Sequence, residues 1–134
     1  MADEIIVNDG GAPSRIIPLT CGSVALDAGD ALSLHSDGTV VTAKTSKAAA
    51  GGEAFIGVAL TDAAVGGIVN VVTGHGIVVR CLVGNVAQGA ALEISNVDGE
   101  LGDYTGTYPA SGQPVAVALE DNGSGSVLTK VLIL

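Results

Sequence analysis

Basic residues are scarce in this sequence, and their scarcity excludes whole classes of partner. Five residues are Lys or Arg against 14 Asp or Glu, which gives a formal net charge of −9. Binding to nucleic acid through the phosphates requires clustered cations, and so does binding to an anionic membrane surface. Long apolar runs are also missing, since none approaches the roughly 18 residues of a membrane-spanning helix. We therefore predict that the partners include neither nucleic acid nor a membrane.

The usual motifs of catalysis and cofactor binding are absent as well. The sequence contains no Walker loop, no GxGxxG fingerprint, no CxxC pair and no HExxH motif. The two histidines, His35 and His75, lack the neighbouring elbow or oxyanion turn of a nucleophile site, so an enzyme would need one of them to meet a cysteine in space. The acidic stretch "DGELGD" (98–103) lacks calcium-loop spacing and is expected to be a solvated turn. We predict no catalytic residue, no cofactor and no metal, and hence no enzyme.

The cysteines are few and far apart. Cys21 and Cys81 are the only two, and nothing in their spacing indicates a disulfide or a metal site. The first residues are acidic rather than basic, so no export signal is expected. For a protein made in the cytoplasm, the prediction is two buried, reduced thiols, while a bridge within or between chains stays open as an alternative.

The residues that are present favour strands and turns. Hydrophobic residues make up 48% of the chain, yet aromatics make up only 2%, so the apolar content is mainly Val, Ala, Leu and Ile. Many runs of four to seven such residues are separated by turns rich in the 20 glycines, and no stretch has sustained helical periodicity. This pattern predicts an all-β fold, a compact small β-barrel or sandwich. With only 14% charged residues, some apolar surface should be left for an oligomeric or docking contact.

One phrase occurs twice in the chain. "IGVALTD" (56–62) is echoed by "VAVALED" (115–121), and Gly29 before "DALSL" is echoed by Gly89 before "AALEI". The order of turn, hairpin, loop and strand is the same around both copies. We therefore predict two similar halves, at about 24–73 and 84–134, within a single β domain of residues 21–134. Since each half is too small to bury a core, we expect the two together to complete one barrel.

Residues 1–20 are expected to form an extended N-terminal arm. Two short apolar runs in this segment are separated by "NDGGAPS" (8–14), which has the composition of a turn or linker. Such runs could add a strand to their own sheet or to a neighbouring subunit. The predicted interface residues are Ile5, Ile6, Val7, Arg15, Ile16, Ile17 and Pro18.

Four segments together resemble a known family. "AGDAL", "IGVALTDAAVGGIVNVVTGHGIVV", "QGAALEI" and "PVAVALED" are similar to stretches of small tailed-phage head proteins of the DUF2190 type, which are taken to be capsid decoration (cement) proteins. The resemblance covers roughly residues 24–134 and departs from the family pattern at Asn122-Gly123-Ser124. It implies a β-rich fold, attachment to the outside of an icosahedral shell, frequent trimers and no catalytic residues.

The resulting prediction is a structural virion protein. It would be made in the host cytoplasm, bind the major capsid protein on the outer capsid surface as a homotrimer, grip the capsid through the arm, and stabilise the expanded head. The alternative is a phage fibre or adhesion module that binds a host-surface glycan, for which Tyr104 and Tyr108 are the residues to test.

Overall fold

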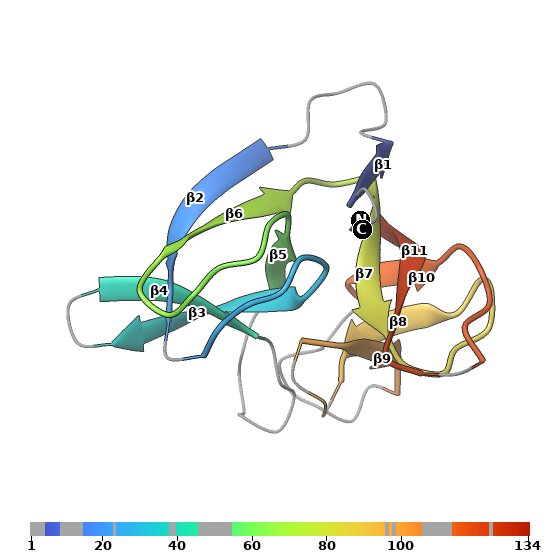
Figure 1. The fold of residues 1–134 in the computed structure, drawn as a ribbon. Helices are drawn as coiled ribbons and strands as arrows, with labels where there is room; N and C mark the ends of the chain where they lie inside the picture. Colours follow the sequence, from blue (N-terminus) through green and yellow to red (C-terminus); the bar gives the residue numbers. More distant parts are fainter. Residues whose placement is uncertain are drawn as a thin grey trace.

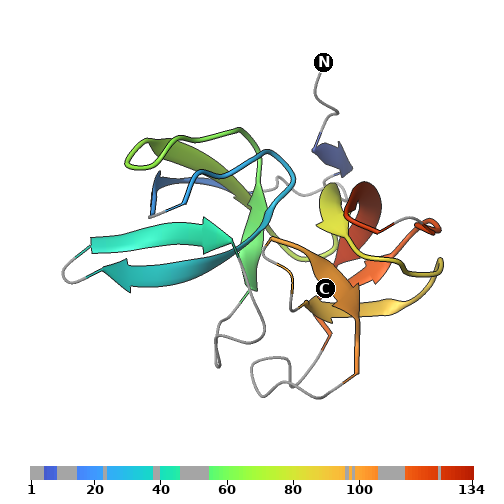
Figure 2. The ribbon, with the colours of Figure 1, turned by 60° about the horizontal axis from the view of Figure 1, so that its bottom comes forward.

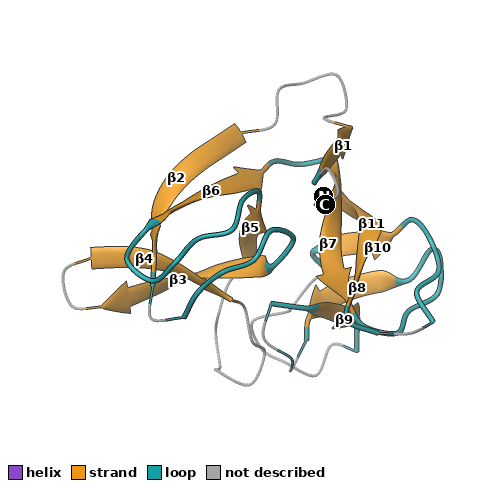
Figure 3. Cartoon of the chain, viewed as in Figure 1, coloured by secondary structure: helices purple, strands orange, loops and turns teal. Residues whose placement is uncertain are grey.

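The described part of the chain is built from strands and turns. The computed structural model describes residues 5–8, 15–22, 24–37, 40–45, 55–95, 97, 99–105, 114–123 and 125–134, and within these residues every regular element is a β-strand (Figure 3). No helix in this part is long and apolar enough to cross a membrane. The all-β prediction is confirmed.

The strands form two closed rings that lie side by side (Figure 1). In the first ring the strand order is β2 (Arg15–Cys21), β4 (Val40–Thr45), β3 (Ala31–Asp37), β5 (Phe55–Ala59) and β6 (Ile68–Thr73). In the second ring it is β7 (Val78–Val83), β11 (Val127–Ile133), β10 (Ala116–Ala118), β8 (Ala91–Ile94) and β9 (Leu101–Asp103). Neighbours are antiparallel, except that β2 pairs with β4 and β7 pairs with β9 in parallel. The strand β1 (Ile6–Asn8) pairs with β7 outside the second ring.

The two rings have the same strand order and the same register. Leu32 lies opposite Gly57 in the first ring, and Leu92 lies opposite Ala116 at the same place in the second. The prediction of two similar halves is therefore confirmed. The structure differs from the expectation of one shared barrel, because each half closes a ring of its own. The buried interiors consist of aliphatic side chains and the two cysteines, which fit inside rings of so few strands.

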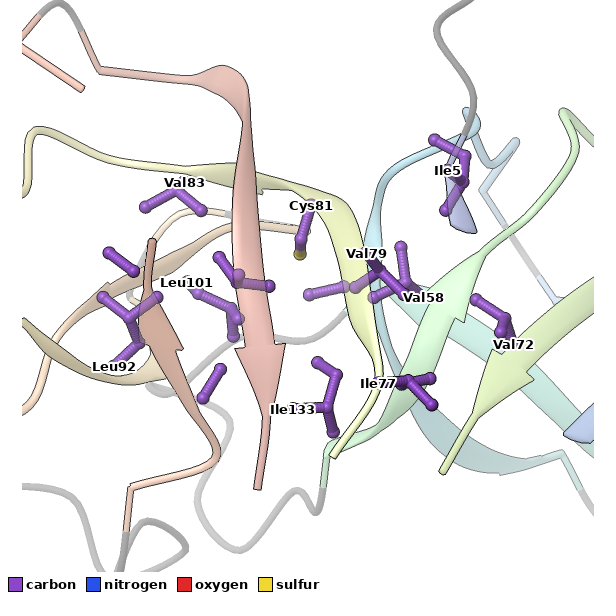
Figure 4. Close-up of a cluster of buried hydrophobic side chains, with 14 of the residues drawn as sticks. Ile5, Val58, Val72, Ile77, Val79, Cys81, Val83, Leu92, Leu101 and Ile133 are labelled. Carbon is purple, nitrogen blue, oxygen red and sulfur yellow. The ribbon is translucent and has the colours of Figure 1, made fainter. Parts of the chain in front are cut away.

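The hydrophobic core has two parts. A small cluster fills the first ring and includes Cys21, Leu26 and Leu32. A larger cluster fills the second ring and continues to Val58 and Val72, which point out of the first ring (Figure 4). The halves therefore bury part of their apolar surface against each other.

A short segment of the first half also completes the wall of the second ring. The strands β7 and β9 pair at a single position, Val83 with Leu101. Beside it, Leu82 N–H donates to the Gly29 carbonyl at 2.9 Å, and Ala31 N–H donates to the Gly99 carbonyl at 2.8 Å. Residues 29–31 thus bridge β7 and β9 where the direct pairing of these two strands stops.

The apolar runs of the predicted arm pair with the rest of the same chain. Ile5 is buried in the larger core, and its carbonyl accepts a hydrogen bond from Arg80 N–H at 2.8 Å. The strand β2 pairs with β6 from Arg15 to Thr20 and so forms part of the first ring. Figure 2 shows β2 within the first ring and β1 beside the second. Both apolar runs therefore add a strand to a sheet of their own chain, which is the first of the two alternatives above.

Candidate functional site

The acidic residue that ends each copy of the repeated phrase holds a turn in place. Asp62 Oδ1 accepts a hydrogen bond from Ala28 N–H at 2.7 Å, and Asp121 Oδ1 accepts one from Gln88 N–H at 2.7 Å. Hydrogen bonds to an ionised carboxylate are stronger than those between neutral groups. Each carboxylate therefore stabilises the glycine turn of its own half by a hydrogen bond. This shared role accounts for the repeat of "IGVALTD" as "VAVALED".

Asn122 also has a role within the fold. The side chain is buried, and its Nδ2 donates to the Val83 carbonyl at 2.8 Å. Its Oδ1 accepts from Gly125 N–H at 3.2 Å, so the amide ties the turn to β7. Asn122 thus stabilises the turn of the second half.

The thiols and histidines do not form a site in the described residues. Both cysteines are free and buried, as predicted. Cys21 Sγ donates to the Val24 carbonyl at 3.1 Å, and burial raises the pKa of the Cys81 thiol, which opposes formation of a nucleophilic thiolate. His75 is exposed, with Nδ1 2.9 Å from the Leu134 carbonyl oxygen. The side chain of His35 lies outside the described residues.

Two glutamates are buried, which the sequence did not indicate. Glu100 lies in the stretch expected to be a solvated acidic turn, but its Oε2 accepts a hydrogen bond from Ser126 Oγ at 2.6 Å. Glu93 Oε1 accepts from both the N–H and the Oγ of Thr105 at 2.7 Å. The expectation for residues 98–103 is therefore wrong at Glu100, and Asp98 lies outside the described residues. Over the described part of the chain, no three His, Cys, Asp or Glu side chains could hold a metal ion together.

Acidic side chains gather where the first half meets the second. Asp30 is the middle residue of the segment 29–31 that bridges β7 and β9, and its Oδ2 accepts a hydrogen bond from Asp27 N–H at 2.9 Å. Burial raises the pKa of Asp30, and the charges of Asp27 and Asp62 raise it further, against the effect of this hydrogen bond. In the second half Ala87 and Ala90 stand in place of Asp27 and Asp30, so the turn itself does not require these two carboxylates.

We expect Asp30→Asn to raise stability at neutral pH. A folded-state pKa above the ordinary value of 3.8 means that stability falls as pH rises through the interval between the two values. The amide still accepts the Asp27 N–H but carries no charge, and the gain should be about 0.5 kcal/mol because the carboxylate is partly screened by solvent. Urea unfolding at pH 7 and at pH 3 checks this, with the gain vanishing at pH 3. Asp103→Asn, at an exposed acid, is the control for net charge, and an equal gain in both variants would contradict the explanation.

The residues of the predicted interface have different surroundings. Ile5 is buried and Ile6 is half-buried, while the side chain of Val7 lies outside the described residues. On β2, by contrast, Ile16 and Ile17 are 50% and 43% exposed. Their neighbours Arg15 and Pro18 are exposed too.

These four β2 residues lie along an open strand edge. β6 pairs with β2 along its length, whereas the described residues of β4 pair with it only at Thr20 and Cys21. We call residues 15–18 the β2 edge. The corresponding part of β7 is covered by β1. Pro18 has no N–H to offer, which is a common way to limit indiscriminate strand pairing at an exposed edge.

The comparisons with known proteins identify a fold. No protein-family model matches the chain, and no curated protein does, so membership of the DUF2190-type family is not supported. A solved structure with the same fold is the N base of the head fiber gp8.5 in bacteriophage phi29. It aligns with a TM-score of 0.62 and 14% sequence identity over 88% of this chain and 94% of that one. At this identity the likeness shows that the two chains share a fold.

Proposed function

We propose that the protein is a structural component of a phage head. The observation that carries this proposal is the likeness of nearly the whole chain to the base of a phage head fiber. The described residues are consistent with a structural role, because their thiols are buried and their acidic side chains hold turns. The proposed role requires no catalysis and no cofactor.

More specifically, we propose that it decorates the outer capsid surface. The β2 edge would contact the major capsid protein, because it presents two exposed isoleucines and one cation on an otherwise strongly acidic chain. Copies bound as homotrimers would hold on through many contacts at once, so each contact could be weak. The expanded head would be stabilised if the protein binds that state better than the others.

Co-sedimentation with expanded, undecorated capsids tests this function. The wild type should saturate the capsids at a fixed stoichiometry. Ile16→Glu combined with Ile17→Glu should reduce occupancy at least about tenfold, because it adds charge to the buried part of the contact. Val97→Glu, at a valine that is 51% exposed on the second half, is the matched control and should bind normally.

Each outcome bears on a different part of the proposal. A wild type that stays in the supernatant with every capsid of its source would overturn the decoration function. Normal binding of the double variant would leave decoration standing and remove the β2 edge from the contact. Deleting residues 1–20 is a poor test, because the deletion removes β1, which pairs with β7, and most of β2, which is part of the first ring.

A second candidate is a fibre base or an adhesion module. The similar structure favours it, since that structure is the N base of a head fiber. Tyr104, 37% exposed after β9, is the described aromatic that could stack on a sugar, and Tyr108 lies outside the described residues. Binding on a glycan array that Tyr104→Ala abolishes would support this candidate over decoration.

A further inference from the structure

The contact between the two halves uses a different face of each half. The first half contributes the turn at Gly29 together with Ala31 and Val58, all of them buried. The second half contributes Leu128 on β11, which lies so close to Gly29 that a Cβ on this glycine would overlap Leu128 Cδ2. Since the two halves are alike, each also has the face that the other uses in this contact.

The second half leaves its copy of the turn face open. Gly89, Ala91 and Val117 correspond to Gly29, Ala31 and Val58, and all three are more exposed than their counterparts. A Cβ on Gly89 would meet no atom within 4 Å. The neighbouring Leu119 is 37% exposed, and its N–H donates to the Lys130 carbonyl just as Leu60 N–H donates to that of Asn70. We call Gly89, Ala91, Val117 and Leu119 the tail face.

The first half likewise leaves its copy of the Leu128 face open. Ile68 pairs with Thr20 as Leu128 pairs with Leu82, so Ile68 is the counterpart of Leu128. It is 61% exposed, and the nearby Val24 and Val65 are exposed as well. We call Ile68, Val24 and Val65 the head face. Both open faces are apolar, and Ile68 and the residues of the tail face correspond to residues that pack together within the chain.

Fewer acidic side chains lie beside the tail face than beside the docked turn of the first half, with Glu120 and Asp121 remaining next to Leu119. On the first half, Asp27 and Asp30 lie beside the turn that docks, and burial penalises Asp30. At the same places beside the tail face are Ala87 and Ala90. A second protein could therefore cover the tail face without desolvating these carboxylates, which is otherwise costly.

We propose that copies of this chain associate head to tail, with the head face of one copy packed on the tail face of the next. The contact would repeat the side-chain packing that joins the halves of a single chain. It would lack the main-chain bond made by Leu82, because Thr20, at the same place, pairs with β4. Such a contact joins two different faces, so it produces a closed ring or an open filament rather than a two-fold dimer. This inference goes beyond the proposed function, since it requires no capsid.

Two variants that each block one face provide the test. Ile68→Glu blocks the head face and Leu119→Glu blocks the tail face, and both replace exposed residues whose change should leave folding intact. Mass is measured by light scattering and sedimentation over a range up to about 1 mM, where contacts with millimolar dissociation constants are populated. Circular dichroism and melting temperature report that each variant is folded.

The expected result is specific to a head-to-tail contact. The wild type and the Val97→Glu control should form larger particles as concentration rises, whereas each blocked variant alone should stay at the mass of one chain. An equimolar mixture of the two variants should form a dimer and nothing larger. The Leu119→Glu variant keeps its head face and the Ile68→Glu variant keeps its tail face, so each pair can make one contact only. A wild type that remains a single chain at about 1 mM, or blocked variants that assemble like the wild type, would overturn the proposal. Capsid binding is measured separately, so failure of the self-contact and failure of the proposed function give different results.

Discussion

Replacing Gly57 by alanine is expected to lower the free energy of unfolding by about 3–5 kcal/mol, which is more than most single substitutions cost. Gly57 has φ of 153°, at a bulge where the register between β3 and β5 shifts. An added Cβ would overlap the Val72 carbonyl oxygen and come within 2.9 Å of Val71 Cγ1. Backbone atoms in a paired strand cannot move away easily, so the cost combines steric overlap with an unfavourable φ. The melting temperature should fall by about 10 °C or more.

Gly66 provides the control for this prediction. It also has a positive φ, 80°, but a Cβ there would meet nothing within 4 Å. Gly66→Ala should therefore cost only the strain of a left-handed backbone, about 1–2 kcal/mol. Thermal unfolding of both variants measures the difference, and equal losses would show that the overlap with Val72 is relieved in solution. The second half has Ala116 at the place of Gly57, in a ladder with no shift of register.

Replacing Ile5 by alanine is expected to cost about 2–4 kcal/mol, because the change leaves a cavity in a packed core. Ile5 is only 3% exposed and belongs to the core that fills the second ring. Ile16→Ala, in the other apolar run of the same N-terminal segment, should cost less than about 0.5 kcal/mol, since that side chain is half exposed. Urea unfolding of the two variants checks this.

The same pair of variants separates stability from binding. Under the proposed function, Ile16→Ala should weaken capsid occupancy while leaving the fold intact. Ile5→Ala should lower stability but bind capsids normally at temperatures where the variant is still folded. A stable Ile5→Ala variant would mean that β1 adds little to the second ring. This would restore Ile5 as a candidate for contact with a partner.

The local patterns of the sequence were sufficient for the fold class. Short Val-rich runs between glycines predict strands, and the paired phrases at 56–62 and 115–121 predict two similar halves. Both predictions concern structure that neighbouring residues determine. The closure of each half into its own ring depends instead on parallel pairs such as Cys21 with Ala43, which are distant in sequence. No local pattern distinguishes such a pair from an open sheet.

The candidate site was predicted less completely, for a related reason. Ile5-Ile6 and Ile16-Ile17 look alike in sequence, yet Ile5 is buried and both Ile16 and Ile17 are exposed. Their surroundings come from β7 and β6, which lie more than 50 residues further along the chain. Similarly, Glu100 has an acidic neighbourhood in sequence, but its side chain is buried and accepts a hydrogen bond from Ser126, 26 residues further along the chain. The head and tail faces depend on the register of the two rings, which no local stretch of sequence determines.

The bridge made by residues 29–31 makes the two halves unequal as folding units. Every strand pair of the first ring lies within residues 15–73, so this ring can close as soon as that segment has been synthesised. The second ring is closed by a direct pairing of β7 with β9 at one position only. Two further main-chain hydrogen bonds link the sides of this closure to residues 29–31 of the first half. During synthesis the N-terminal half becomes available first. We therefore expect the first ring to form before the second and to supply two main-chain hydrogen bonds to it, so that the order of the halves along the chain matches the expected order of folding.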